Sequence, residues 1–175
     1  MKRIILIGYM GAGKTTVGKA LARELGLAFY DLDWYIESRR RKTVAQLFAE
    51  VGEEGFRTIE HNMLHEVAEF EDVVVSCGGG TPCFFDNIDY MNRQGQVVYL
   101  RCHPDVLVEH LAMSKNERPL LKGKTPDELR RFIAAQLQRR EPFYSKARYT
   151  FDVSLMDNYE KIKVTIEQLR HMLDV

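Results

Sequence analysis

The residues with the clearest chemical meaning lie near the N-terminus, in the segment Gly8-Tyr9-Met10-Gly11-Ala12-Gly13-Lys14-Thr15. The segment matches the pattern GxxxxGK[ST] in full, directly after an apolar run and before apolar residues at helical spacing. Glycines let backbone N–H groups turn toward phosphate oxygens, and the positive end of the following helix adds to the attraction. We therefore expect ATP to bind here, with the Thr15 hydroxyl on Mg²⁺ and the phosphates on Gly11, Ala12, Gly13, Lys14, Thr15 and Thr16. A glycine-rich turn that merely opens a helix is the alternative.

Two carboxylates, Asp31 and Asp33, follow the apolar run Ala28-Phe29-Tyr30. If this run is a strand of a parallel sheet, both lie at the same carboxyl edge as the glycine-rich loop. A carboxylate at this edge can accept a proton from an attacking hydroxyl or hold water on magnesium. Position alone equally allows an N-cap for a helix that starts at Trp34.

Arg57 and Glu60 are three residues apart and meet on one face of a predicted helix. Surface pairs of this kind are usually solvated and contribute little, and the spacing alone favours that interpretation. Farther along, Gly78-Gly79-Gly80 follows a buried strand, and the absence of side chains lets the backbone approach a ligand closely. A flexible connector is the alternative, and for neighbouring Cys77 a structural role is favoured over a nucleophilic one.

These residues need a scaffold, and the apolar pattern predicts one. Unbroken apolar runs without alternation indicate strands covered on both faces, as in a parallel sheet. The runs are Arg3–Ile7, Ala28–Tyr30, Val73–Val75, Val97–Leu100 and Tyr149–Val153. Helices lie between them, and the last one should face the sheet with Ile162, Ile166, Leu169 and Leu173. The fold class is therefore α/β, a parallel β-sheet flanked by helices.

Three helix starts are readable from capping patterns. Thr43 and Thr125 each precede, by three residues, a Gln or Glu that can complete a capping box. Asp157, three residues before Glu160, repeats the spacing ahead of the last helix. Two segments exceed the simple alternation: residues 33–70, which hold two helices, and the basic residues 112–124, which we interpret as a mobile lid.

Composition limits the function classes. The chain has 175 residues and 45% apolar residues, which suits a single domain over 1–175, and 25 basic residues balance 25 acidic ones. Zero net charge argues against a nucleic-acid partner. No apolar stretch reaches the ~20 residues of a membrane span. The N-terminus leaves no room for a signal peptide, and three cysteines without zinc or CxxC spacing indicate a reducing compartment, so we expect a cytoplasmic protein. The five histidines show no metal-ligand spacing.

Taken together, the motifs resemble those of the shikimate kinase family. Its pattern reads here Arg57-x-x-Glu60-x-x-x-Leu64, followed by Val74-Val75-Ser76-Cys77-Gly78-Gly79-Gly80. Asp31-x-Asp33, Arg118-Pro119-Leu120-Leu121 and Arg140-x-Pro142-x-Tyr144 also match. The resemblance implies a three-layer P-loop kinase with acceptor-binding helices at 33–70 and a lid at 112–124. It also implies a monomer that uses Mg²⁺ and transfers the ATP γ-phosphoryl group to the 3-hydroxyl of shikimate.

The resemblance also implies roles for single residues. Asp33 would bind the hydroxyl that is phosphorylated and act as its base, while Arg57 and Arg140 would bind the shikimate carboxylate. Gly79 would bind a ring hydroxyl through its N–H. Arg118 would bind ATP and, with Lys14 and Asp33, form the catalytic set.

One departure from the family concerns the adenine base. The family's arginine that stacks on adenine is absent from Leu111-Ala112-Met113-Ser114, where Met113 offers only an apolar contact. A kinase of gluconate or of a nucleoside monophosphate, or a nucleotide-dependent switch protein, are the other interpretations. The chain lacks the NKxD and DxxG motifs of a GTPase switch.

Overall fold

The computed structural model of the chain describes residues 1–113, 121–154 and 156–175. Its strands form one parallel sheet in the order β2-β3-β1-β4-β5. They are β1 (Arg3–Ile7), β2 (Ala28–Asp31), β3 (Val73–Ser76), β4 (Gln96–Arg101) and β5 (Tyr149–Asp152). The five runs predicted as strands are confirmed, with ends that differ by no more than one residue.

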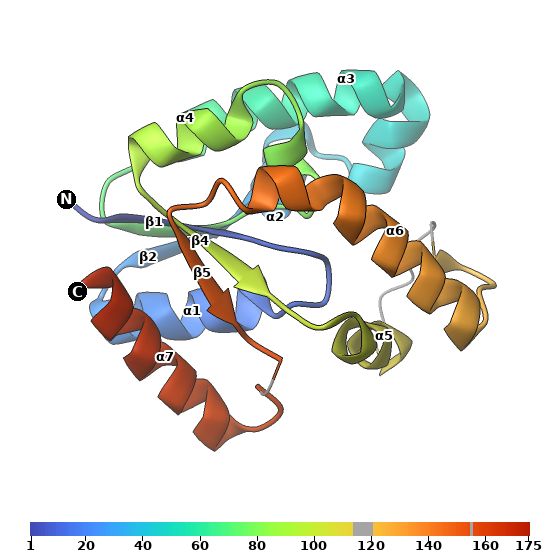
Figure 1. The fold of residues 1–175 in the computed structure, drawn as a ribbon. Helices are drawn as coiled ribbons and strands as arrows, with labels where there is room; N and C mark the ends of the chain where they lie inside the picture. Colours follow the sequence, from blue (N-terminus) through green and yellow to red (C-terminus); the bar gives the residue numbers. More distant parts are fainter. Residues whose placement is uncertain (114–120, 155) are drawn as a thin grey trace.

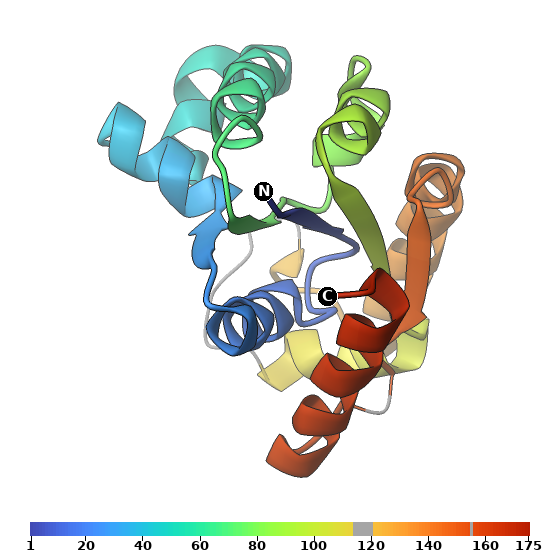
Figure 2. The same ribbon diagram turned by 90° about the vertical axis from the view of Figure 1, so that its left-hand side faces the viewer.

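Helices cover both faces of this sheet (Figure 1). They are α1 (Lys14–Leu25), α2 (Leu32–Arg40), α3 (Val44–Val67), the short η1 (Thr81–Cys83), α4 (Asn87–Gln94), α5 (Pro104–Met113), α6 (Pro126–Tyr144) and α7 (Tyr159–Leu173). The view along the sheet in Figure 2 separates α1 and α7 on one face from α3 and α4 on the other. The fold is thus the predicted three-layer arrangement.

Alternating side chains of the central strand divide the core in two. Ile4 and Leu6 belong to the apolar cluster under α1 and α7, whereas Ile5 and Ile7 belong to the cluster under α3 and α4. All four side chains are at most 1% exposed. Because helices exclude water from both faces, a continuous apolar run is the sequence that such a strand requires.

Two of the three predicted helix starts are confirmed. The side chains of Thr43 and Thr125 cap α3 and α6, and both capping boxes are complete. The prediction for Asp157 is wrong by one residue: the Asn158 side chain accepts from the N–H of Lys161 at 3.0 Å and caps α7. Asp157 instead makes an ion pair with the Lys161 ammonium at 2.7 Å.

The segment 33–70 contains α2 and α3, as predicted, and α3 is interrupted. Gly52 has φ 72° and ψ 179°, a left-handed and non-helical conformation that glycine adopts without strain. The chain therefore changes direction within α3, and the rings of Phe48 and Phe56 on either side of the kink lie 4.4 Å apart.

Most of the predicted lid lies outside the described residues, which break off after Met113 at the end of α5 and resume at Leu121. The prediction of a lid at 112–124 therefore stays a prediction. In the part of the chain that the structure covers, no helix combines the length and apolar character needed to cross a membrane.

Candidate active site

The glycine-rich loop joins β1 to α1 at the carboxyl edge of the sheet. Gly8, Gly11 and Gly13 have φ values of 149°, 84° and 92°, so the loop uses backbone conformations that side chains with a Cβ rarely adopt. α1 begins at Lys14 and therefore points its positive end into the loop. The Lys14 ammonium donates to the carbonyl oxygens of Gly8 at 2.7 Å and Tyr9 at 3.0 Å, which holds it over the loop.

A cavity of about 650 Å³ opens at this edge. Of the residues predicted to bind nucleotide or acceptor, it is lined by Gly11, Gly13, Lys14, Thr15, Thr16, Asp33 and Gly79. Ala12, Arg57 and Arg140 are not among its lining residues. Ala12 is 1% exposed and its N–H donates to the Tyr9 carbonyl at 3.1 Å, and the two arginines lie against the glycine turn. The fold thus brings the phosphate-binding loop, the carboxylate and the glycine turn around one space.

Asp31 explains the start of α2. Its carboxylate accepts from the N–H of Trp34 at 3.1 Å, so Asp31 is the N-cap and Asp33 lies in the first turn. The Thr15 hydroxyl donates to the other oxygen of Asp31 at 3.3 Å. A hydroxyl and a carboxylate at this separation fit the oxygen ligands that Mg²⁺ requires.

Asp33 has an unusual environment for a carboxylate. Burial, together with the negative charges of Asp31 and Glu60, raises its pKa from 3.8 to about 6, against the opposing effect of the Lys14 ammonium. A carboxylate with a pKa near working pH can accept a proton and keep it, which is what general-base catalysis requires.

The interpretation of Arg57 and Glu60 as a solvated pair is wrong. The Glu60 side chain is 1% exposed and that of Arg57 is 12% exposed, and Arg57 Nη1 donates to Glu60 Oε1 at 3.0 Å. The Thr81 hydroxyl donates to the second carboxylate oxygen at 2.8 Å. The Phe84 ring centroid lies 4.2 Å from the guanidinium carbon, so the Arg57 group is held on an aromatic face as well.

The glycine turn lies directly against two arginines. A methyl group on Gly79 would stand 2.9 Å from Arg140 Nη1, and one on Gly80 would stand 2.6 Å from Arg57 Nη2, so a side chain at either position would push a guanidinium group out of its place. The hydroxyl of buried Tyr144 donates to the Gly79 carbonyl at 2.5 Å and fixes the turn. The turn is therefore an anchored part of the site, and the alternative of a flexible connector is not supported.

Two buried donors at this turn have no hydrogen-bond partner among the described residues: Nε of Arg57 and Nη1 of Arg140. An unpaired buried donor costs about 1–3 kcal/mol, so such groups call for an explanation. Guanidinium groups with open donors match the geometry of a carboxylate or phosphate. The acceptor side of the site thus favours an anion.

Sequence reasoning missed the contacts of Thr81 and Phe84, which belong to no motif, and it gave no role to Tyr144, which is part of the Arg140-x-Pro142-x-Tyr144 match. Arg118 lies outside the described residues, so its predicted role is untested. Cys77 is buried and burial raises the pKa of its thiol, which agrees with a structural role. The cavity is also lined by Met113, His110 and the run 156–159, and His110 Nδ1 lies 2.7 Å from the Gly11 carbonyl oxygen.

A parallel sheet whose first strand leads through a GxxxxGK[ST] loop into a helix is the architecture of P-loop nucleotide-binding proteins. The guanidinium groups of Arg57 and Arg140 beside the glycine turn indicate, within this class, a kinase whose acceptor is a small anion. Comparison with known proteins identifies the group of kinases. A sequence model of the shikimate kinase family matches residues 10–170. The chain belongs to the shikimate kinase family.

Individual relatives agree over the full length. A shikimate kinase of Phocaeicola vulgatus is 58% identical over 99% of both chains. The 1.7 Å crystal structure of shikimate kinase from Bacteroides thetaiotaomicron is 54% identical, covers 99% of both chains and superimposes with a TM-score of 0.97. The Acinetobacter baumannii shikimate kinase in complex with shikimate is 34% identical, covers 99% of this chain and 94% of its own, and gives a TM-score of 0.84.

Proposed function

We propose that this protein transfers the γ-phosphoryl group of ATP to the 3-hydroxyl of shikimate and releases shikimate 3-phosphate and ADP. One observation carries the acceptor side: unpartnered buried donors of Arg57 and Arg140 flank the glycine turn at the cavity. They supply a fixed pair of guanidinium groups for the carboxylate of shikimate. The family match supports the same substrate.

The remaining groups position the hydroxyl and the phosphoryl group. Asp33 accepts the proton of the attacking hydroxyl, and the Gly79 N–H binds a ring hydroxyl beside it. Lys14 neutralises charge on the β- and γ-phosphates, with the backbone of Gly11, Ala12 and Gly13 and the side chains of Thr15 and Thr16 around them. Phosphoryl transfer depends on such positioning and charge neutralisation more than on covalent chemistry.

Mg²⁺ would be held by the hydroxyl of Thr15, with the carboxylate of Asp31 next to it. When bound with ATP, the ion neutralises phosphate charge.

Arg118 adds a second positive charge when residues 112–124 close over the site as a lid, which also excludes water. Residues 33–70 form the acceptor-binding part of a single kinase domain. Three lining residues of the cavity, the apolar Met113 and Met156 and the ring of Tyr159, contact adenine in place of the family's arginine.

The decisive experiment is a turnover assay that measures ADP release with MgATP and each acceptor in turn. Shikimate should support turnover, whereas gluconate and nucleoside monophosphates should not. Gluconate has a carboxylate but no ring to hold its hydroxyls in place, and a nucleoside monophosphate needs more space and contacts to its base. Turnover with either of the other acceptors and none with shikimate would refute the proposal. Chelation of Mg²⁺ with EDTA should stop the reaction, and added Mg²⁺ should restore it.

The compartment and the oligomeric state are also part of the proposal. The three cysteines, Cys77, Cys83 and Cys102, are free thiols, which supports a reducing cytoplasm. One chain supplies all described groups of the proposed site, so we propose that the enzyme acts as a monomer on small-molecule substrates. Light scattering during gel filtration tests this directly.

A further inference from the structure

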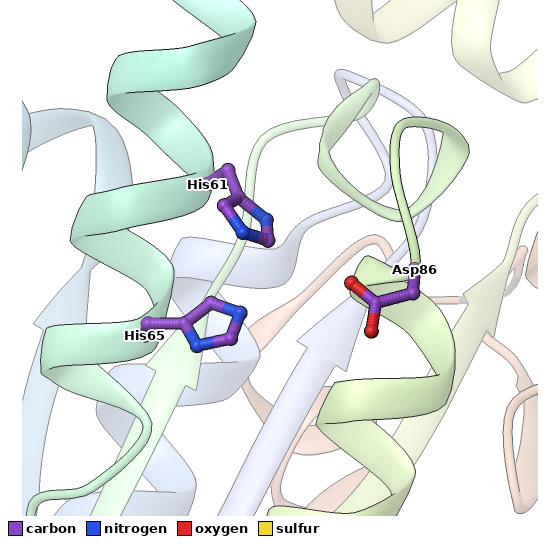
Figure 3. Close-up of side chains that lie close together, drawn as sticks. All are labelled: His61, His65 and Asp86. Atoms are coloured by element: carbon purple, nitrogen blue, oxygen red, sulfur yellow. The ribbon is translucent and has the colours of Figure 1, made fainter.

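Two histidines and an aspartate form a cluster outside the cavity of the proposed active site. One potential ligand atom from each of His61, His65 and Asp86 lies within 4.8 Å of the other two. Figure 3 shows both imidazole rings projecting from α3 toward the carboxylate of Asp86, which precedes α4. We propose that these three side chains bind a divalent transition-metal ion, with Zn²⁺ as the ion that fits them best. The expectation that the histidines show no metal-ligand spacing is therefore wrong for this pair, whose i, i+4 spacing places both rings on one helix face.

His61 has the tautomer that a metal ligand needs. Its Nδ1 lies 2.6 Å from the side-chain oxygen of Asn87. The Asn87 amide nitrogen donates to the Thr81 carbonyl at 2.9 Å, which fixes the amide so that its oxygen faces the histidine. His61 Nδ1 therefore carries the proton and donates it, and the lone pair is on Nε2. Histidines that bind metals are oriented in this way by a hydrogen bond from their other nitrogen.

His65 offers a ligand atom that lacks a partner. Its Nε2 is buried and has no hydrogen-bond partner among the described residues. The ring stacks on Tyr90 at a centroid distance of 3.6 Å and an angle of 10°, so its orientation is fixed. A metal ion at Nε2 would give this nitrogen the partner that the described residues do not supply.

Asp86 supplies the adjustable third ligand. Its side chain is 58% exposed and makes an ion pair at 3.5 Å with Arg93, which is 61% exposed. It makes no cap hydrogen bond to α4, so it can rotate without loss of helix stability. Ligand atoms around a tetrahedral Zn²⁺ lie roughly 3.3 Å apart when each bond is about 2.0–2.1 Å, so the cluster must tighten a little. Rotation of this exposed carboxylate provides the movement, and water can take the fourth position.

The ligand set distinguishes this site from the proposed magnesium site. Imidazole nitrogens suit Zn²⁺, Ni²⁺ and Cu²⁺, whereas Mg²⁺ prefers oxygen ligands and keeps its water. The ion would also join α3 to the segment before α4. That junction is continuous with the acceptor side, because Thr81 bonds both Asn87 and Glu60.

The test is calorimetric titration of the nucleotide-free protein with ZnCl₂, together with thermal unfolding. We expect one Zn²⁺ per chain, a raised Tm, and no displacement by millimolar Mg²⁺. Asp86→Ala and His65→Ala should each weaken Zn²⁺ binding at least ~10-fold, the smallest loss expected when a metal site is disturbed. Asp89→Ala, an exposed carboxylate in the first turn of α4, and His171→Ala, an exposed histidine on α7, are matched controls that should bind as the wild type does.

Asp86→Ala keeps the proposal testable if His65→Ala fails to fold, because Asp86 is on the surface. Visible absorption of bound Co²⁺ gives a second readout, since a tetrahedral site with nitrogen ligands has a strong signal that Asp86→Ala should reduce. The proposal is overturned if the wild type binds no Zn²⁺. It is equally overturned if Asp86→Ala binds as tightly as the wild type, or if His171→Ala removes the binding.

Discussion

Asp33→Asn should make this protein more stable and much less active at once. In the folded chain the pKa of Asp33 is about 6, against an ordinary value of 3.8. This rise from 3.8 to about 6 corresponds to about 3 kcal/mol, since a change of one in pKa is ~1.4 kcal/mol. This is the order of the cost of keeping the buried carboxylate ionised. The amide has nearly the same shape and carries no charge, so the substitution removes that cost.

Because the pKa of Asp33 is raised on folding, the gain in stability from Asp33→Asn depends on pH. Because the folded pKa is raised, the folded state holds the proton more tightly than the unfolded state between pH 3.8 and about 6. The stability of the wild type therefore falls as pH rises through this window. Asp33→Asn should exceed the wild type by up to ~3 kcal/mol at pH 7.5, or roughly 5–10 °C in Tm, and by little at pH 4.

Urea unfolding of the ligand-free proteins at both pH values measures the stability, and ADP release measures turnover. Turnover should drop by roughly 100-fold or more, the scale of a lost general base. The wild-type kcat/KM should rise with pH through an apparent pKa near 6. Asp89→Asn is the matched control, because Asp89 occupies the first turn of α4 as Asp33 occupies that of α2, and it should change stability by less than ~0.5 kcal/mol. A loss of stability at pH 7.5, or activity within a few-fold of the wild type, would refute the assignment of Asp33.

Five further substitutions test the other groups. Lys14→Met should lower turnover at least ~100-fold with the fold intact by circular dichroism, and near-normal turnover would contradict its role on the phosphates. Arg57→Ala or Arg140→Ala should weaken shikimate binding by ~1.5–3 kcal/mol in calorimetry, and a neutral amide analogue should lose affinity for the wild type but much less for these variants. Glu60→Ala should destabilise the protein by up to ~3–5 kcal/mol in urea unfolding, because it leaves Arg57 with only the exposed Glu53, 3.6 Å away, as an ionic partner, whereas a surface pair would cost under ~1 kcal/mol. Arg118→Ala should reduce kcat at least ~100-fold and leave shikimate affinity within about three-fold, and a large loss of affinity would place it on the acceptor instead.

The sequence predicted those parts of the fold that depend on local pattern. Strand runs such as Val73–Ser76 are apolar on both faces, which only a covered parallel sheet tolerates. Thr43 and Thr125 cap helices because each has its partner three residues ahead. The prediction that Asp157 caps the last helix was wrong because Asn158, the next residue, is an equally good capping residue and Asp157 pairs with Lys161 instead. A choice between two adjacent capping residues depends on packing that the local pattern does not contain.

In the candidate site too, the features that depend on local sequence could be predicted and those that depend on tertiary packing could not. The glycine-rich loop was predictable because its residues are consecutive and their roles follow from backbone geometry. Asp33 was predictable as a group at the sheet edge, but its raised pKa depends on burial and on Glu60, which comes from α3. Arg57 and Glu60 were assigned to the surface because their spacing is that of an ordinary exposed pair. Their burial comes from Thr81 and Phe84, which the fold brings from the segment after β3.

The histidine cluster follows from the same packing event. His61 directly follows Glu60 on α3, a step of about 100° around the helix. The segment after β3 that buries Glu60 through Thr81 continues to Asn87, which orients His61. Helical spacing determines which α3 side chains share a face. The segment that packs against this face determines whether its side chains meet solvent, an anion or, as we propose, a metal ion. A single helix sequence cannot specify that outcome, because Thr81, Asp86 and Asn87 contribute no signal until β3 and β4 fix where their connection runs. We therefore expect Asn87→Ala to weaken both Zn²⁺ binding and shikimate binding, since Asn87 contacts both His61 of the proposed metal site and Thr81 of the acceptor side.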